Sequence, residues 1–84
     1  MILFDYKKFL KENDFGDNAL EVFKSPEDVE VFGTEKELLY LASRIIEFVE
    51  ENAVKNIFAE LNFDAGIDLS SDSSDFRVFF KSAD

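Results

Sequence analysis

The side chains of this chain that could do chemistry are carboxylates and hydroxyls without a partner base. There is no histidine and no cysteine, which excludes Ser-His-Asp and Cys-His arrangements and thiolate metal sites. The serines of the segment 70–74 therefore have no imidazole to activate them. The three glycines are isolated in the sequence, so no glycine-rich loop can cradle a phosphate. We predict no catalytic residues, no enzyme activity and no cofactor.

Four aspartates in one polar stretch are the candidate for a cation site. Asp64, Asp68, Asp72 and Asp75 offer the oxygen ligands that hard cations prefer. Their spacing fits no calcium-loop pattern, and a solvated loop is the better explanation of them, so we predict no metal site. An enzyme that uses a carboxylate-bound metal is the alternative, and calorimetry with magnesium, calcium and manganese would detect it.

A second set of residues could bind a partner without catalysis. If the predicted strands turn their main apolar face inward, each places one phenylalanine on the opposite face, with glutamates nearby. The set comprises Phe23, Phe32, Phe58 and Phe79 with Glu21, Glu30 and Glu60. Aromatic residues at the centre of a patch and charges at its rim are typical of a protein-binding surface. We predict that this set contacts a basic protein.

The element that must position these strands is a helix over residues 34–52. Its apolar residues recur at spacings of three and four and so share one face. They are Leu38, Leu41, Ala42, Ile45, Phe48 and Val49. Thr34 and Glu37 have the spacing of a capping box. Asn52 suits the end of the helix, because asparagine tolerates the left-handed conformation.

Alternating apolar and polar residues predict strands over 19–24, 29–32, 56–63 and 76–81. A turn with Pro26 at its second position joins the first two strands into a hairpin. Ten apolar residues are expected to face the helix: Leu20, Val22, Val29, Val31, Ile57, Ala59, Leu61, Phe76, Val78 and Phe80.

The order β-β-α-β-β predicts one α+β domain over residues 1–84, built as a single four-stranded sheet with the long helix packed on one face. A short N-terminal segment precedes it, either irregular or a helix over 5–13 capped by Asp5, and residues 13–18 are turn-like. The segment 5–13 has an apolar edge made of Tyr6, Phe9 and Leu10, which is one candidate cover for the outward phenylalanines. The other candidates are a partner protein and a second copy of the chain.

The formal net charge is −10, from 19 acidic and 9 basic residues. Direct nucleic-acid binding is excluded, since it requires a basic footprint, whereas positive partners are attracted. Solubility alone is the simpler explanation of this charge. The apolar residues 1–4 are too few for a signal sequence, and no run approaches a membrane span. With no cysteine, a cytoplasmic location is expected.

Residues 29–80 carry a pattern that resembles one protein family. A strand ends in Val31-Phe32-Gly33-Thr34, a later strand ends in Leu61-Asn62-Phe63-Asp64, and a loop with Leu69-Ser70 leads to Phe76-Arg77-Val78. This pattern is similar to that of bacterial polymorphic-toxin immunity proteins. The resemblance implies a protein that binds and neutralises a toxin encoded by a neighbouring gene, and the acidity would suit a basic toxin such as a nuclease.

Two other functions are compatible with the sequence. An acidic mimic of nucleic acid would need carboxylates spaced like phosphates and little aromatic contact. A homodimeric structural subunit would bury the outward phenylalanines against a second copy, and sedimentation would detect it.

Overall fold

The structure is a computed structural model that describes residues 4–13 and 20–83. Its elements are α1 (Tyr6–Glu12), β1 (Glu21–Lys24), β2 (Val29–Phe32), α2 (Glu35–Lys55), β3 (Ala59–Phe63) and β4 (Phe76–Phe80). The α+β class and the order of the elements are confirmed. Apart from Asn13, the predicted turn at 13–18 lies outside the described residues, as does position 19, where the first strand was expected to begin.

The start of α2 follows from its capping residues. The Glu37 side chain accepts a hydrogen bond from the Thr34 backbone N–H at 2.7 Å, and the Thr34 hydroxyl accepts one from the Glu37 N–H at 3.2 Å. The predicted capping box is therefore confirmed. The predicted end at Asn52 is wrong, because the helix continues to a C-cap at Asn56 with φ 51° and ψ 44°. Both positions are asparagine, and only Asn56 adopts the left-handed conformation that ends a helix.

The prediction of a single four-stranded sheet is wrong. Within residues 4–13 and 20–83, β1 pairs only with β2, and β3 only with β4, which gives two antiparallel two-stranded sheets. At the outer edge of β1, the loop before β4 takes the place that a further strand would need. Ser70 N–H donates to the Leu20 carbonyl at 2.8 Å, and Ser74 N–H donates to the Val22 carbonyl at 2.7 Å. No strand can add where these backbone groups are already bonded.

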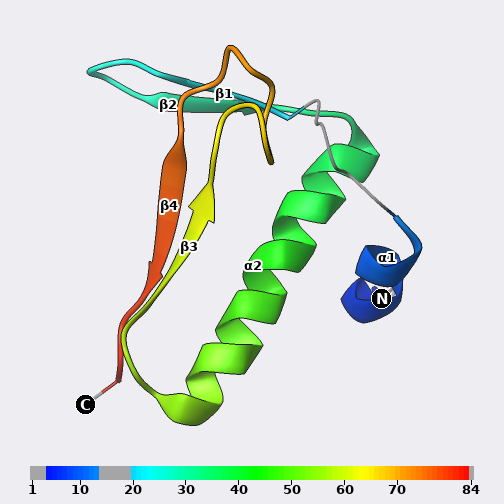
Figure 1. The fold of residues 1–84 in the computed structure, drawn as a ribbon, viewed down its shortest axis with the longest axis vertical. Helices are drawn as coiled ribbons and strands as arrows, with labels where there is room; N and C mark the ends of the chain where they lie inside the picture. The colour runs from blue at the N-terminus through cyan, green and yellow to red at the C-terminus, as the bar shows by residue number, and fades with distance from the viewer. Residues whose placement is uncertain (1–3, 14–19, 84) are drawn as a thin grey trace.

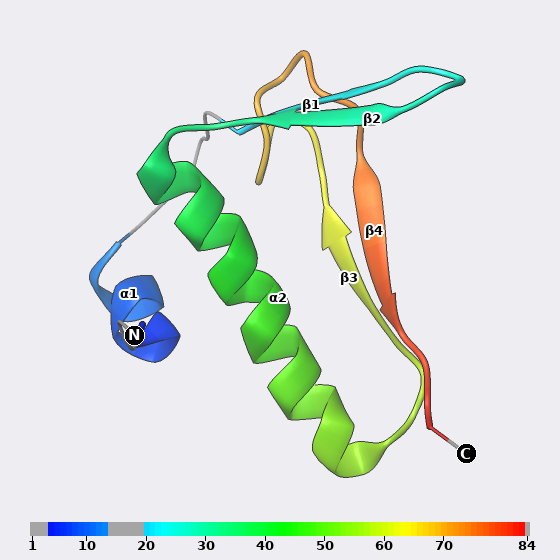
Figure 2. The ribbon, with the colours of Figure 1, turned by 180° about the vertical axis from the view of Figure 1, so that it is seen from behind.

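Helix α2 lies between α1 on one side and the β3–β4 hairpin on the other, while the β1–β2 hairpin crosses one end of this arrangement (Figures 1 and 2). The Tyr6 hydroxyl of α1 donates a hydrogen bond to the Glu50 carboxylate of α2. This bond is lost when the phenol ionises, so it raises the pKa of Tyr6 to about 12. Since α1 packs on α2, it does not cover the outward phenylalanines, and that candidate cover is ruled out.

The core lies where the two hairpins meet α2. Leu20, Val22, Phe63 and Leu69 are fully buried there, and the Phe63 ring stacks on Phe76 with 4.7 Å between centroids. Around them pack Tyr40, Leu41, Ile45, Leu61, Phe76 and Val78.

Of the residues expected to face the helix, Val29, Val31 and Ile57 are exposed instead. The two valines lie on β2, which has no buried residue. The predicted helix stripe is also only partly right. Phe48 is buried, Leu41 and Ile45 are half-buried, and Leu38, Ala42 and Val49 are exposed. Elements pack on two sides of α2, so a single stripe does not describe its buried surface.

Candidate partner-binding site

The outward face of the β1–β2 hairpin is acidic and aromatic. The register places Glu21 opposite Phe32 and Phe23 opposite Glu30, so the four side chains share one face and the two phenylalanines are diagonal neighbours. Their ring centroids lie 5.9 Å apart with the planes tilted by 57°. Within the described residues neither glutamate has an ion-pair partner. This face therefore presents two exposed rings and two unneutralised carboxylates.

The outward face of the β3–β4 hairpin has a second ring pair but a different charge. Phe58, just before β3, stacks on Phe79 of β4 with 5.7 Å between centroids. The rings stay open to water, with 64% of Phe58 and 48% of Phe79 exposed. Glu60, which lies opposite Phe79, pairs with Arg77 at 3.8 Å. One carboxylate and one guanidinium thus offset each other beside this pair.

All four predicted phenylalanines and all three predicted glutamates are exposed, but the structure does not bring them together on one sheet. It groups them into two patches. We call Glu21, Phe23, Glu30 and Phe32 the acidic aromatic patch, and Phe58, Glu60, Arg77 and Phe79 the neutral aromatic patch. The single continuous face that a four-stranded sheet would have carried is absent, because the two hairpins belong to different sheets.

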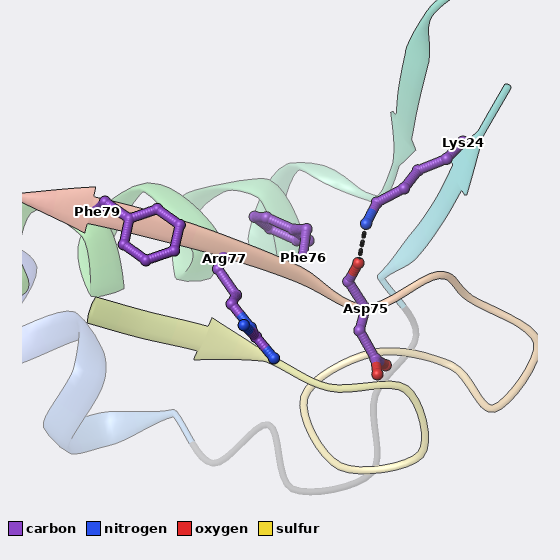
Figure 3. Close-up of a pocket in the computed structure, with 5 residues that line it drawn as sticks. All are labelled: Lys24, Asp75, Phe76, Arg77 and Phe79. Carbon is purple, nitrogen blue, oxygen red and sulfur yellow. Dashed lines mark hydrogen bonds between the residues drawn. The ribbon is translucent and has the colours of Figure 1, made fainter. Parts of the chain in front are cut away.

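A surface pocket of about 530 Å³ lies where the two hairpins meet (Figure 3). It is lined by Lys24 of β1 together with Asp75, Phe76, Arg77 and Phe79. The Lys24 ammonium donates to the Asp75 carbonyl and so ties the end of β1 to the start of β4. Sequence reasoning missed this pocket, because nothing in the local pattern indicates that Lys24 reaches across to another hairpin.

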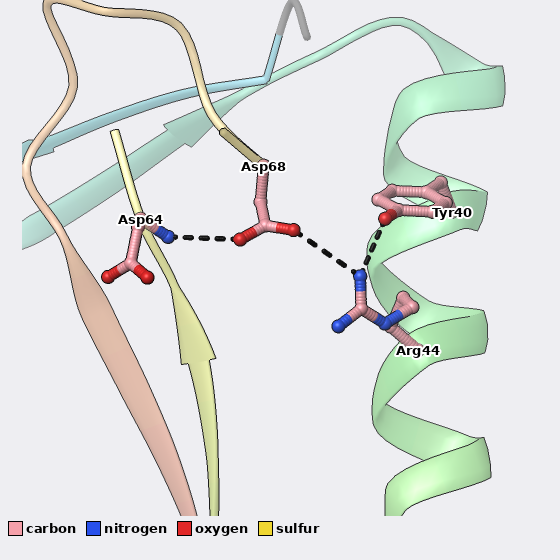
Figure 4. A network of polar contacts seen from close by, with 4 residues as sticks. All are labelled: Tyr40, Arg44, Asp64 and Asp68. Atoms are coloured by element: carbon pink, nitrogen blue, oxygen red, sulfur yellow. Dashed lines mark hydrogen bonds and ion pairs between the residues drawn. The ribbon is translucent and has the colours of Figure 1, made fainter. Parts of the chain in front are cut away.

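A polar network links α2 to the loop between β3 and β4 (Figure 4). Arg44 donates to the Tyr40 hydroxyl at 2.6 Å and pairs with Asp68 at 3.4 Å, and Asp68 accepts a hydrogen bond from the Asp64 N–H at 3.2 Å. The Arg44 guanidinium also lies over the Phe63 ring, 5.4 Å from its centroid. The network stabilises the loop that holds the edge of β1.

The sequence contained a signal for Arg44 that its charge obscured. Charge alone places Arg44 on the water-facing side of the helix. Yet it follows Tyr40 by four residues and precedes the buried Phe48 by four. Residues at that spacing lie on the same side of a helix, so the spacing places Arg44 on the inner side.

The candidate cation loop uses its carboxylates for internal contacts. Asp68 binds Arg44 and the Asp64 N–H, and Asp75 accepts from the Ala65 N–H at 2.7 Å. Across residues 4–13 and 20–83, no three acidic side chains converge as metal ligands would. In the same part of the chain, neither helix has the length and apolar composition to cross a bilayer.

The two aromatic patches are thus distinguished by pairs of aromatic rings that are in contact with each other and exposed to solvent. No protein-family model matches the chain, and no curated protein or solved structure matches it either. The resemblance to immunity proteins therefore stays a prediction.

Proposed function

We propose that this chain is a non-enzymatic binding protein that captures a basic protein through its two aromatic patches. The observation that carries the proposal is the exposure of both ring pairs, one of which lies beside two unpaired glutamates. Exposed aromatic side chains bury large apolar areas at an interface and are frequent among its strongest contacts. Unpaired carboxylates raise the rate of encounter with a positively charged partner.

Neutralisation of a toxin is the form of binding that the family resemblance suggests. A protein that covers a basic active site needs acidic charge and rigid contact residues but no catalytic group, and the patch residues lie on strands, except for Phe58, which directly precedes β3. The aromatic content also favours this role over mimicry of nucleic acid, which would use carboxylates alone.

The product of the gene next to this one is the protein that tests the proposal. We expect it to be basic, to stop growth when expressed alone, and to form a complex with this chain that restores growth. Phe32→Ala and Phe79→Ala should each weaken the complex by about 2 kcal/mol or more, as is typical for a central aromatic contact.

Val54→Ala is the matched control, because Val54 is exposed on α2 outside both patches. It should leave the affinity unchanged. A neighbouring product that is harmless, or that is toxic and not bound by this chain, would refute the immunity role.

A further inference from the structure

The outer edge of β2 has backbone groups that point away from the hairpin. Ser25 N–H donates to the Asp28 carbonyl at 2.9 Å, so these two residues form a hydrogen-bonded pair. Bonded and non-bonded pairs alternate in an antiparallel ladder. The N–H and C=O groups of Val29 and Val31 therefore point outward. β1 follows the same alternation on its own outer side, where both backbone groups of Val22 bond to the 70–74 loop.

Nothing in the described part of the chain pairs with this edge or blocks it. β2 is the last strand of its sheet, and all of its residues are exposed, including Val29 at 59% and Val31 at 39%. Natural proteins usually protect such an edge with lysine, proline or a bulge, and β2 contains neither of these residues. An open, apolar edge is a template for another strand.

The two faces beside this edge have different chemistry. Val29 and Val31 project on one face, and Glu30 and Phe32 project on the other, where they belong to the acidic aromatic patch. A strand added to β2 would place successive side chains on these two faces in turn. Apolar residues would meet the valines, and basic residues would meet the carboxylate of Glu30.

We propose that β2 accepts an extended segment of the basic partner as an additional strand, and that this segment alternates apolar and basic side chains. The inference depends on the proposed function and specifies how the acidic aromatic patch is used. Backbone hydrogen bonds to Val29 and Val31 would hold the segment, and the alternating faces would select its sequence.

A second copy of this chain fits the same edge less well. Strand β2 beside another β2 would bring two acidic hairpins together, each with Glu27 and Asp28 at the turn and Glu30 on the strand. Like charges across a strand pair are destabilising, and each copy carries a net charge of −10. The charge of the edge thus favours a basic strand.

The test uses the full chain and an acetylated, amidated decapeptide of alternating valine and lysine as the probe. A peptide of the same composition, with its five valines first and its five lysines last, is the control for charge without alternation. Calorimetry at physiological salt measures both affinities, and residue-resolved amide exchange by NMR measures protection of the edge. Sedimentation of the chain alone measures self-association.

We expect the alternating peptide to bind at least about tenfold more tightly than the control peptide, whose valines and lysines are segregated. We also expect it to slow exchange of the Val29 and Val31 amides by about tenfold or more. Val31→Pro should weaken binding by about tenfold, since proline removes an outward N–H that the hairpin itself does not use. If this variant fails to fold, amide protection in the unmodified chain still decides.

Equal affinity for the two peptides, or unprotected Val29 and Val31 amides in the bound state, would overturn the proposal. A dimer that Val31→Pro abolishes would do so as well, since the edge would then belong to a second copy. Loss of toxin binding in Phe32→Ala together with unprotected edge amides would leave the proposed function standing and remove only the added strand. Failure of every basic probe, including the neighbouring gene product, would remove both.

Discussion

The two hairpins resemble each other on the outside and differ on the inside. Each carries an exposed pair of phenylalanines, whose ring centroids lie 5.9 Å apart in β1–β2 and 5.7 Å apart in β3–β4. On the inner side, every inward residue of β3 and β4 is half-buried or buried, and Phe63 at the end of β3 is fully buried. β1–β2 contributes only Val22 from its strands. We infer that β3–β4 supplies most of the stability and that β1–β2 is free to serve binding.

The charges of the outward faces differ in the same sense. Beside the β3–β4 rings, Glu60 is offset by Arg77, whereas beside the β1–β2 rings both glutamates lack an ion pair among the described residues. Charge that a fold does not neutralise is available to a partner. Under the proposed function, β1–β2 would supply the long-range attraction to the partner, and both hairpins would supply contact area.

The largest expected effect tests where stability comes from. Phe63→Ala removes a ring that is fully buried, and should lower the free energy of unfolding by about 3–5 kcal/mol. Phe32→Ala removes an exposed ring of the other hairpin, and should cost less than about 1 kcal/mol. Urea unfolding followed by circular dichroism measures both. Similar losses in the two variants would show that the hairpins share the stability equally.

The second prediction compares two valines of the same hairpin. Val22→Ala should cost about 2 kcal/mol, because two buried methyl groups are lost and a cavity remains. Val29→Ala lies on the same face of the hairpin but beyond the core, and should change the stability by less than about 0.5 kcal/mol. The same unfolding measurement applies. A large loss in Val29→Ala would mean that the outer half of the hairpin is also packed.

The elements could be predicted from the sequence because their signals are local. The spacing of Thr34 and Glu37 specified the start of α2, and alternation specified each strand to within a few residues. The number of sheets could not be predicted this way. It depends on Ser70 and Ser74 bonding to the backbone of β1, and nothing in a polar loop identifies its distant partner.

For the candidate site, too, the sequence predicted the individual residues but not their arrangement. Alternation correctly identified Phe23, Phe32 and Phe79 as outward residues, since a strand must turn every second side chain the other way. It could not show that they form two patches, because that follows from the arrangement of the hairpins. Nor could it place α1 against α2, where Tyr6 meets Glu50, since the only surface expected to receive α1 was the set of outward phenylalanines.

The third prediction tests the difference in charge. Glu30→Gln removes an unpaired carboxylate from the acidic aromatic patch, and should slow association with a basic partner a few-fold at low salt, with little effect at high salt. Glu60→Gln removes the same charge from the β3–β4 hairpin, and should slow association less because it leaves the acidic aromatic patch unchanged. Stopped-flow association with the neighbouring gene product measures both rates. Equal slowing would show that net charge alone matters and that the position of the carboxylate does not.

The smallest expected effect comes from Arg77→Gln, which makes the outward face of β3–β4 resemble that of β1–β2. The pair with Glu60 is exposed and 3.8 Å long, so its loss should change the free energy of unfolding by less than about 0.5 kcal/mol. Because the variant leaves Glu60 unpaired beside two exposed rings, it should speed association with a basic partner at low salt. The gain should be small if the partner approaches mainly through β1–β2, and as large as the loss in Glu30→Gln if both hairpins steer it. A slower association in Arg77→Gln would indicate instead that Arg77 itself contacts the partner, so that the outward face of β3–β4 would bind through its cation and not only through its rings.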